Sequence, residues 1–268
     1  MHIIERGSGE PLVLIPGVQG RWEYMRRTID ALAESYRVLT FPLCDEPTAQ
    51  AAFDPNHVID SFATQVERVL DTRGIARAAI CGASFGGIVA LRVAARTPSR
   101  VSALVMASTP GPHWHLRARH RFYTRLPWLF GPVFAAESPW RLRREINIAL
   151  PARIDRRRFR IEQARTLMRA PLSFSRMAIR ARAIELHDRR ADCALVACPT
   201  LIIHGDPALD HVVNTGGTSE YAQLIRGARV AMMEGTGHLG CITRPREFAA
   251  VVRAFLSASQ QDSHHSAA

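Results

Sequence analysis

The chain has 268 residues, of which 47% are hydrophobic and 22% charged, with 17 Gly and 16 Pro. This composition excludes collagen-like, disordered and coiled-coil proteins and is typical of a globular fold. The formal net charge is +11, and every basic residue is Arg. Residues 110–192 hold 19 Arg against 7 acidic residues, while the rest of the chain is close to neutral. No nucleic-acid-reading motif accompanies this basic segment, so we expect no nucleic-acid partner.

The sequence also predicts the compartment and the absence of a metal site. No run approaches the roughly 18 apolar residues that cross a membrane. Glu5 and Glu10 precede the first apolar run, which is the reverse of a signal peptide. The five cysteines are scattered and form no C-x-x-C pair, which indicates free thiols. We therefore expect a cytoplasmic protein that binds no metal.

Short apolar runs alternate with helical patterns along the chain. The runs predict strands at Leu12–Ile15, Arg37–Phe41, Ala78–Cys81, Val101–Ala107, Thr200–His204 and Arg229–Met233. Most are continuously apolar, as in parallel strands that are covered on both faces. Helices are predicted at Trp22–Ser35, Val58–Arg73, Phe85–Thr97, Thr218–Ile225 and Pro245–Ala258. This order predicts an α/β protein with a doubly wound, mostly parallel sheet.

The alternation is interrupted between residues 110 and 192. This segment is predicted to form helices at Trp140–Ala149, Phe159–Met168 and Phe174–His187. About 80 residues are too many for a bare loop in a compact domain. We therefore expect a helical cap at 110–192, inserted into a core made of 1–109 and 193–258, with a flexible tail at 259–268.

The sequence Gly-Ala-Ser-Phe-Gly-Gly at 82–87 joins a predicted strand to a predicted helix. A bare G-x-S-x-G pattern arises by chance in about one chain in ten of this length, so its placement carries the argument. Gly82 and Gly86 relieve the crowding of a sharp turn and leave the Ser84 Oγ exposed as a nucleophile. The alternative is a glycine-rich helix start with Ser84 as its cap. A serine nucleophile needs a base and an orienting carboxylate.

His238 is the candidate base, since it follows the last predicted strand among small residues that let a loop carry its imidazole over the sheet edge. The alternative is a structural loop histidine. Two candidate acids, Asp206 and Asp210, follow the strand that ends at His204. In folds where the nucleophilic serine lies on a strand-to-helix turn, the acid and then the histidine follow it along the chain. Either aspartate satisfies this order.

These motifs resemble those of the α/β-hydrolase superfamily over nearly the whole chain apart from the inserted segment. The resemblance implies Asp210 as the acid after a short insertion, with Asp206 as a turn residue. It also implies an oxyanion hole made by the backbone N–H groups of Val18 and Phe85. Pro16-Gly17 stands where the family often has His-Gly, and Gln19 is a candidate to face the site.

Two other regions depart from the family pattern. The loop at 42–48 differs from the usual glycine-rich sequence after the second central strand. So few residues precede Leu12 that one or both of the leading antiparallel strands are expected to be missing. Neither departure affects Ser84, Asp210 or His238.

The resemblance implies a serine hydrolase without a cofactor, most simply a carboxylic ester hydrolase with an acyl-enzyme intermediate. A C–C bond hydrolase or perhydrolase on the same triad, or a non-enzymatic ligand-binding protein of this fold, are the alternatives. His113, Trp114, Trp128 and Phe130 are candidate substrate contacts, although the aromatic residues could equally pack the cap on the core. The expected partner is a small ester or acyl compound. The Arg-rich cap either contacts an anionic membrane or acidic carrier, or is a solvated face.

Overall fold

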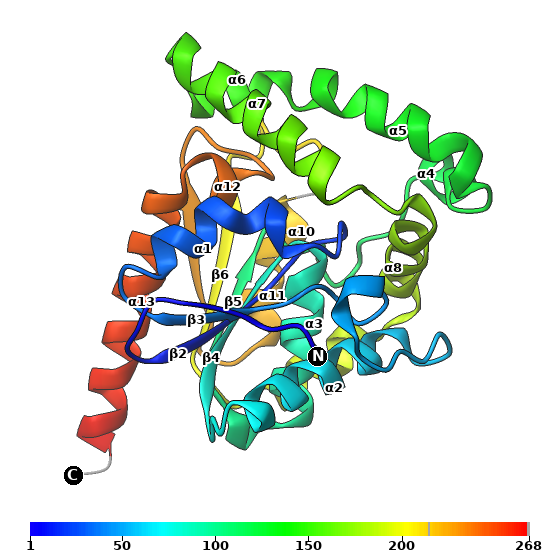
Figure 1. The fold of residues 1–268 in the computed structure, drawn as a ribbon. Coiled ribbons are helices and arrows are strands. Elements are labelled where there is room, and N and C mark those ends of the chain that lie inside the picture. Colours follow the sequence, from blue (N-terminus) through cyan, green and yellow to red (C-terminus); the bar gives the residue numbers. More distant parts are fainter. Residues whose placement is uncertain (214, 267–268) are drawn as a thin grey trace.

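The computed structural model describes residues 1–213 and 215–266. Within them, seven strands form one sheet in the order β1-β3-β2-β4-β5-β6-β7 (Figure 1). The strands are β1 (Ile4–Arg6), β2 (Pro11–Ile15), β3 (Arg37–Thr40), β4 (Ala78–Ala83), β5 (Val101–Ala107), β6 (Thr200–Gly205) and β7 (Arg229–Met233). Only β1 runs antiparallel to its neighbour, β3. The predicted doubly wound, mostly parallel sheet is confirmed, and one leading antiparallel strand is present.

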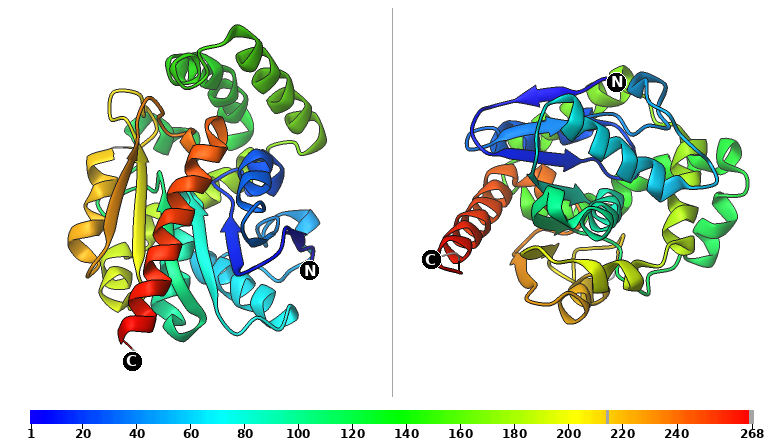
Figure 2. Two further views of the ribbon diagram at one scale, coloured as in Figure 1. Left: turned by 90° about the vertical axis from the view of Figure 1, so that its left-hand side faces the viewer. Right: turned by 90° about the horizontal axis from the view of Figure 1, so that it is seen from below.

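Helices cover both faces of the sheet. On one face lie α1 (Arg26–Leu32) and α13 (Pro245–Ser266), and α13 crosses the front of the sheet in the left view of Figure 2. On the other face lie α2 (Val58–Thr72), α3 (Phe85–Arg96) and α9 (Arg189–Leu195). The remaining short elements are η1 (Trp22–Met25), η2 (Pro47–Ala49), η3 (Pro98–Arg100), α10 (Thr215–Ser219), α11 (Tyr221–Leu224) and α12 (Gly240–Thr243).

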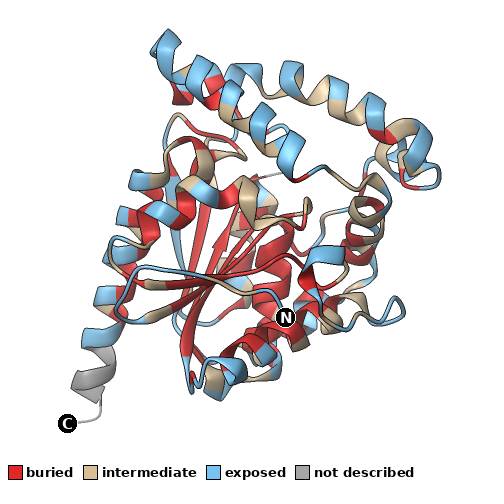
Figure 3. Cartoon of the chain, viewed as in Figure 1, coloured by how far each residue is buried: buried red, intermediate tan, exposed pale blue. Residues whose placement is uncertain are grey.

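The two-residue period of a strand divides the core into two apolar layers. In β2, Leu12 and Leu14 pack toward α1 and α13, whereas Val13 and Ile15 pack toward α2 and α3. All four residues are fully buried, and the central strands of the sheet are red, for buried, in Figure 3. Fully burying such a side chain contributes about 1.5–3 kcal/mol. The continuously apolar strand sequences follow from this burial on both faces.

Most of the inserted segment forms helices above the sheet, and we call α4–α8 the cap. These are α4 (Ala118–Tyr123), α5 (Pro127–Arg141), α6 (Arg143–Ala149), α7 (Arg153–Arg169) and α8 (Phe174–Leu186). The helix α6 contacts α12 after β7, and α7 contacts η1 after β2, so the cap lies over the carboxyl ends of the strands (Figure 1). Figure 3 shows that α5–α7 are largely exposed.

Both predicted domain ends differ from the observed elements. The predicted end of the cap at residue 192 falls inside α9, which packs against α3. The tail predicted at 259–268 is instead helical to Ser266, where α13 ends, and Ser259 at its start is buried and bonds the Phe255 carbonyl. Residues 267–268 of that predicted tail lie outside the described residues.

Glycines allow α3 to start close against β2 and β4. A Cβ at Gly82 would overlap the carbonyl oxygen of Gly86, and a Cβ at Gly86 would overlap that of Ile15. Both obstacles are backbone atoms, which cannot rotate away.

We expect Gly86→Ala to lower the free energy of unfolding by about 1–3 kcal/mol or more, because the added methyl has to push the backbones of α3 and β2 apart. Gly217→Ala is the matched control, since the nearest atom to its added Cβ is 3.7 Å away. Chemical denaturation of both variants measures the difference. Equal stabilities would show that the close approach of α3 is unimportant.

Candidate active site

Ser84 lies at the turn between β4 and α3 in an unusual backbone conformation. Its φ is +53° and its ψ −117°, which costs on the order of 1–3 kcal/mol for a non-glycine residue. Its backbone N–H donates to the Ala107 carbonyl of β5 at 2.7 Å. Among the described residues, the Ser84 side chain forms no capping hydrogen bond with α3. The turn therefore presents the hydroxyl outward instead of using it as a helix cap.

His238 lies beside this hydroxyl. Its Nε2 is 3.1 Å from the Ser84 Oγ, a hydrogen-bond distance. The loop that carries His238 follows β7, and its Gly235 has a φ of +64°. The imidazole is close enough to accept the hydroxyl proton, which a serine nucleophile requires.

The two candidate acids differ in their surroundings. The Asp210 Oδ2 lies 3.4 Å from the His238 Nδ1, and the carboxylate is fully buried. Its Oδ1 accepts the backbone N–H groups of Val212 and Val213 at 2.8 and 2.9 Å. In contrast, the Asp206 Oδ1 accepts the N–H of Ala208 at 2.8 Å, as a turn residue does. The structure thus brings Asp210, and not Asp206, to the imidazole.

The pKa values of this pair shift in opposite directions. Burial alone would lower the pKa of His238, but the adjacent carboxylate of Asp210, with the charge of Glu145, raises it overall. Burial alone would raise the pKa of Asp210, but His238 and the two loop amides lower it. Asp210 is therefore ionised at neutral pH and favours the protonated imidazole.

The predicted oxyanion donors, Val18 and Phe85, belong to segments that adjoin Ser84. Phe85 is the first residue of α3, and the first N–H groups of a helix have no acceptor within the helix. Gly17 lies beside Ser84, since a Cβ on Gly17 would be 3.6 Å from the Ser84 Cβ and 3.1 Å from the Gln19 Oε1. The loop containing Val18 and Gln19 therefore borders Ser84, and Gln19 folds back over Gly17.

A buried arginine of the cap holds this loop. Arg180 of α8 is fully buried, and its guanidinium donates to the Val18 carbonyl oxygen at 2.8 Å. It also bonds the carboxylates of Asp45 and Glu46 at 2.6 and 2.5 Å. Arg180 does not stand out in the sequence, because it is one of 19 arginines in the inserted segment. The adjacent acids Asp45 and Glu46 in an otherwise apolar loop were the available signal.

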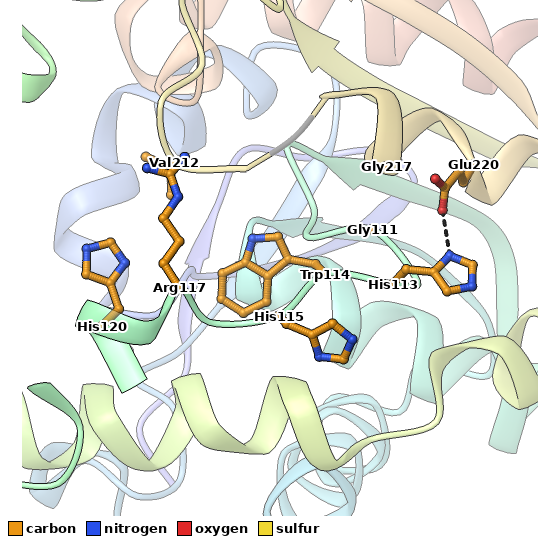
Figure 4. A pocket seen from close by; sticks show the side chains of 9 residues that line it. All are labelled: Gly111, His113, Trp114, His115, Arg117, His120, Val212, Gly217 and Glu220. Atoms are coloured by element: carbon orange, nitrogen blue, oxygen red, sulfur yellow. Dashed lines mark hydrogen bonds and ion pairs between the residues drawn. The ribbon is translucent and has the colours of Figure 1, made fainter. Parts of the chain in front are cut away.

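Of the four other candidate substrate contacts, two line a cavity and two lie on the cap helix α5. His113 and Trp114 line a cavity of about 280 Å³, where the His113 Nδ1 bonds the Glu220 carboxylate at 2.9 Å (Figure 4). Trp128 is 70% exposed. Phe130 stacks on Tyr123 with ring centroids 5.1 Å apart, which is packing within the cap.

The described residues include no cluster of three or more His, Cys, Asp or Glu side chains that is suited to a metal ion. All five cysteines are buried free thiols. No described helix is both long and apolar enough to span a bilayer.

The chain belongs to the α/β-hydrolase family, because residues 10–245 match the sequence profile of the alpha/beta hydrolase fold. It is 26% identical to a pimeloyl-[acyl-carrier protein] methyl ester esterase from Nitrosomonas europaea, over 92% of this chain and 96% of that protein. It is 28% identical to a 2-hydroxymuconate semialdehyde hydrolase from Pseudomonas sp. strain CF600, over 96% and 90% of the two chains. An enol-lactonase structure from Burkholderia xenovorans LB400 has the same fold, with a TM-score of 0.77 and 22% identity over 96% of each chain.

We expect Asp210→Asn to lower the pKa of the His238 imidazole, because the substitution removes the charge that stabilises the imidazolium. Asp206→Asn keeps the charge at Asp210 and should leave this pKa unchanged. The measurement is an NMR titration of the histidine rings, with His238→Gln assigning the signal. A larger shift in Asp206→Asn would reverse the assignment of the acid.

Proposed function

We propose that this protein is a serine hydrolase that cleaves carboxylic esters of small molecules through an acyl-enzyme intermediate. The observation that carries the proposal is the line of contacts from the Ser84 Oγ to the His238 Nε2, and from the His238 Nδ1 to the buried carboxylate of Asp210. A triad of this kind is recognised by geometry and roles on many folds.

In the proposed reaction, His238 removes the hydroxyl proton as the Ser84 Oγ attacks the ester carbonyl carbon. The oxyanion that forms is stabilised by the backbone N–H groups of Val18 and Phe85. The tetrahedral intermediate collapses as His238 gives its proton to the departing alcohol, and the acyl group stays on Ser84. A water molecule, activated by the same imidazole, then releases the acid. Asp210 orients the ring and stabilises the imidazolium in both steps.

The relatives support two chemistries on these residues. Similarity to the methyl ester esterase favours ester cleavage. Similarity to the 2-hydroxymuconate semialdehyde hydrolase favours a second candidate, the hydrolysis of a C–C bond next to a carbonyl. We propose Gln19, His113 and Trp114 as substrate contacts, because Gln19 borders the nucleophile and the other two line the cavity next to the loop of Asp210.

The Arg-rich cap adds an electrostatic preference to this proposal. Arg153, Arg157 and Arg160 of α7 are exposed and line a shallow surface depression with Arg156. A concentration of one charge sign raises the encounter rate with oppositely charged molecules. We therefore propose that anionic esters are favoured over cationic ones of equal size.

A fluorophosphonate probe should label the native protein at Ser84, because the probe reacts with an activated serine hydroxyl. Ser84→Ala should abolish labelling. Intact-mass spectrometry measures the adduct, and a panel of p-nitrophenyl esters of increasing acyl length then defines the ester preference. An unlabelled native protein, or equal labelling of Ser84→Ala, would favour a non-enzymatic binding protein. Labelling with no ester turnover would favour the C–C bond hydrolase.

The pH profile of ester hydrolysis should fall on its acid side, because only the neutral imidazole can accept the hydroxyl proton. Since the pKa of His238 is raised, this limb should lie above the ordinary histidine value of about 6.5. Asp210→Asn should move the limb to lower pH and reduce kcat by about 10⁴-fold. Asp206→Asn should do neither. The profile is measured as kcat/KM, and a limb that stays in place in Asp210→Asn would contradict the assignment.

A further inference from the structure

A second acidic side chain contacts the loop that carries His238, and it comes from the cap. Glu145 lies in the first turn of α6 and has no exposed surface. Its Oε1 accepts the backbone N–H of Gly237 at 2.9 Å and that of Leu239 at 2.6 Å. These two amides flank His238, so one carboxylate oxygen holds the backbone on both sides of the imidazole.

The loop has room for this carboxylate only because residue 237 is glycine. A Cβ on Gly237 would lie 2.8 Å from the Glu145 Cδ and 2.7 Å from the Leu209 carbonyl oxygen. The φ of Gly237 is not in the left-handed region, so the close approach of its neighbours, and not its backbone conformation, requires glycine. Leu209 directly precedes Asp210. Glu145, the loop of His238 and the loop of Asp210 therefore meet at one point.

Cap packing alone does not explain a carboxylate at this position. Burial raises the pKa of Glu145 to about 7, despite the two amide donors. Its Oε2 is buried and has no hydrogen-bond partner among the described residues. An apolar side chain would avoid this desolvation, since burying an ionisable group is unfavourable unless it is fully paired. Unlike an apolar side chain, the carboxylate accepts hydrogen bonds from two particular amides and so fixes their orientation.

We propose that Glu145 is a positioning residue that aligns the His238 imidazole with Ser84 by holding the two backbone amides beside it. The alignment of the base then depends on the docking of α6, which makes the cap part of the catalytic machinery as well as a cover. The inference rests on the proposed function, because it assigns Glu145 a role in the activation of Ser84.

Three variants of Glu145 and one control variant separate this positioning role from a contribution to stability. Glu145→Ala removes the acceptor of both amide hydrogen bonds, and Glu145→Asp shortens the side chain by one methylene while it keeps the charge. Glu145→Gln keeps an acceptor oxygen of the same length. Ile146→Ala is the matched control, because Ile146 belongs to an apolar cluster with Leu150 and Phe159, against which Leu239 and Ile242 pack. Its apolar side chain contributes to the docking of α6 but cannot accept the two amides.

The experiment measures the rate of Ser84 labelling by a fluorophosphonate as a function of probe concentration, together with the melting temperature of each variant. We expect Glu145→Ala and Glu145→Asp to reduce the maximal labelling rate by about 10–100-fold, because a base displaced by about 1 Å loses efficiency on this scale. The half-saturating probe concentration should change little. Glu145→Gln should recover most of the rate, and Ile146→Ala should lower the melting temperature with a rate within about threefold of the native one.

The outcomes distinguish the two proposals. A native rate in Glu145→Ala or Glu145→Asp, or a loss no greater than that in Ile146→Ala at equal stability, would overturn the role of Glu145 and leave the hydrolase intact. If Glu145→Ala fails to fold, Glu145→Asp and Glu145→Gln still decide the matter. Native protein that is not labelled at all would overturn the proposed function, and the role of Glu145 with it.

Discussion

The sharp turn between β4 and α3 is the constraint on which the site depends. Ser84 occupies a positive φ there, and packing has to offset the cost of this conformation. Gly86 lets α3 approach the Ile15 carbonyl of β2. Phe85, fully buried, makes an edge-on contact with Phe62 of α2 with ring centroids 5.5 Å apart. The same packing that fixes the turn exposes the hydroxyl of Ser84 at the carboxyl edge of the sheet.

The order of the strands brings the other groups to this edge. The loops that carry Asp210 and His238 follow β6 and β7, which are adjacent and parallel. The Asp206 N–H donates to the Thr236 carbonyl at 2.7 Å and joins the two loops. Asp206 thus contributes to the site through its backbone, while the Asp210 side chain faces the imidazole. Strand pairing therefore determines where Asp210 and His238 lie, and loop hydrogen bonds determine their final separation.

Features that depend on local sequence pattern could be predicted, whereas features that depend on contacts between distant residues could not. Five of the six predicted strands lie inside the sheet, and their burial on both faces leaves continuous apolar runs. The sixth, β7, is an edge strand whose apolar sequence is largely exposed. The seventh strand, β1, escaped prediction because its three residues, Ile4–Arg6, are partly or fully exposed and carry no apolar pattern. Ser84 and His238 stood out because small residues surround them. Asp206 and Asp210 could not be separated by spacing, since the choice between them depends on loop bonds that only the folded structure displays.

Neither Arg180 nor Glu145 stands out at its own position in the sequence, because each acts on residues distant in the chain. Arg180 binds the loop of Val18, and Glu145 binds the loop of His238. Breaking a buried charge interaction costs about 3–5 kcal/mol, yet a well-packed apolar replacement is often as stable. What these two buried polar side chains add is direction, since Arg180 donates to the Val18 carbonyl and Glu145 accepts the amides of Gly237 and Leu239. The other arginines of the cap are mostly exposed. Arg180 and Glu145 instead couple the docking of the cap to the conformations of the Val18 and His238 loops.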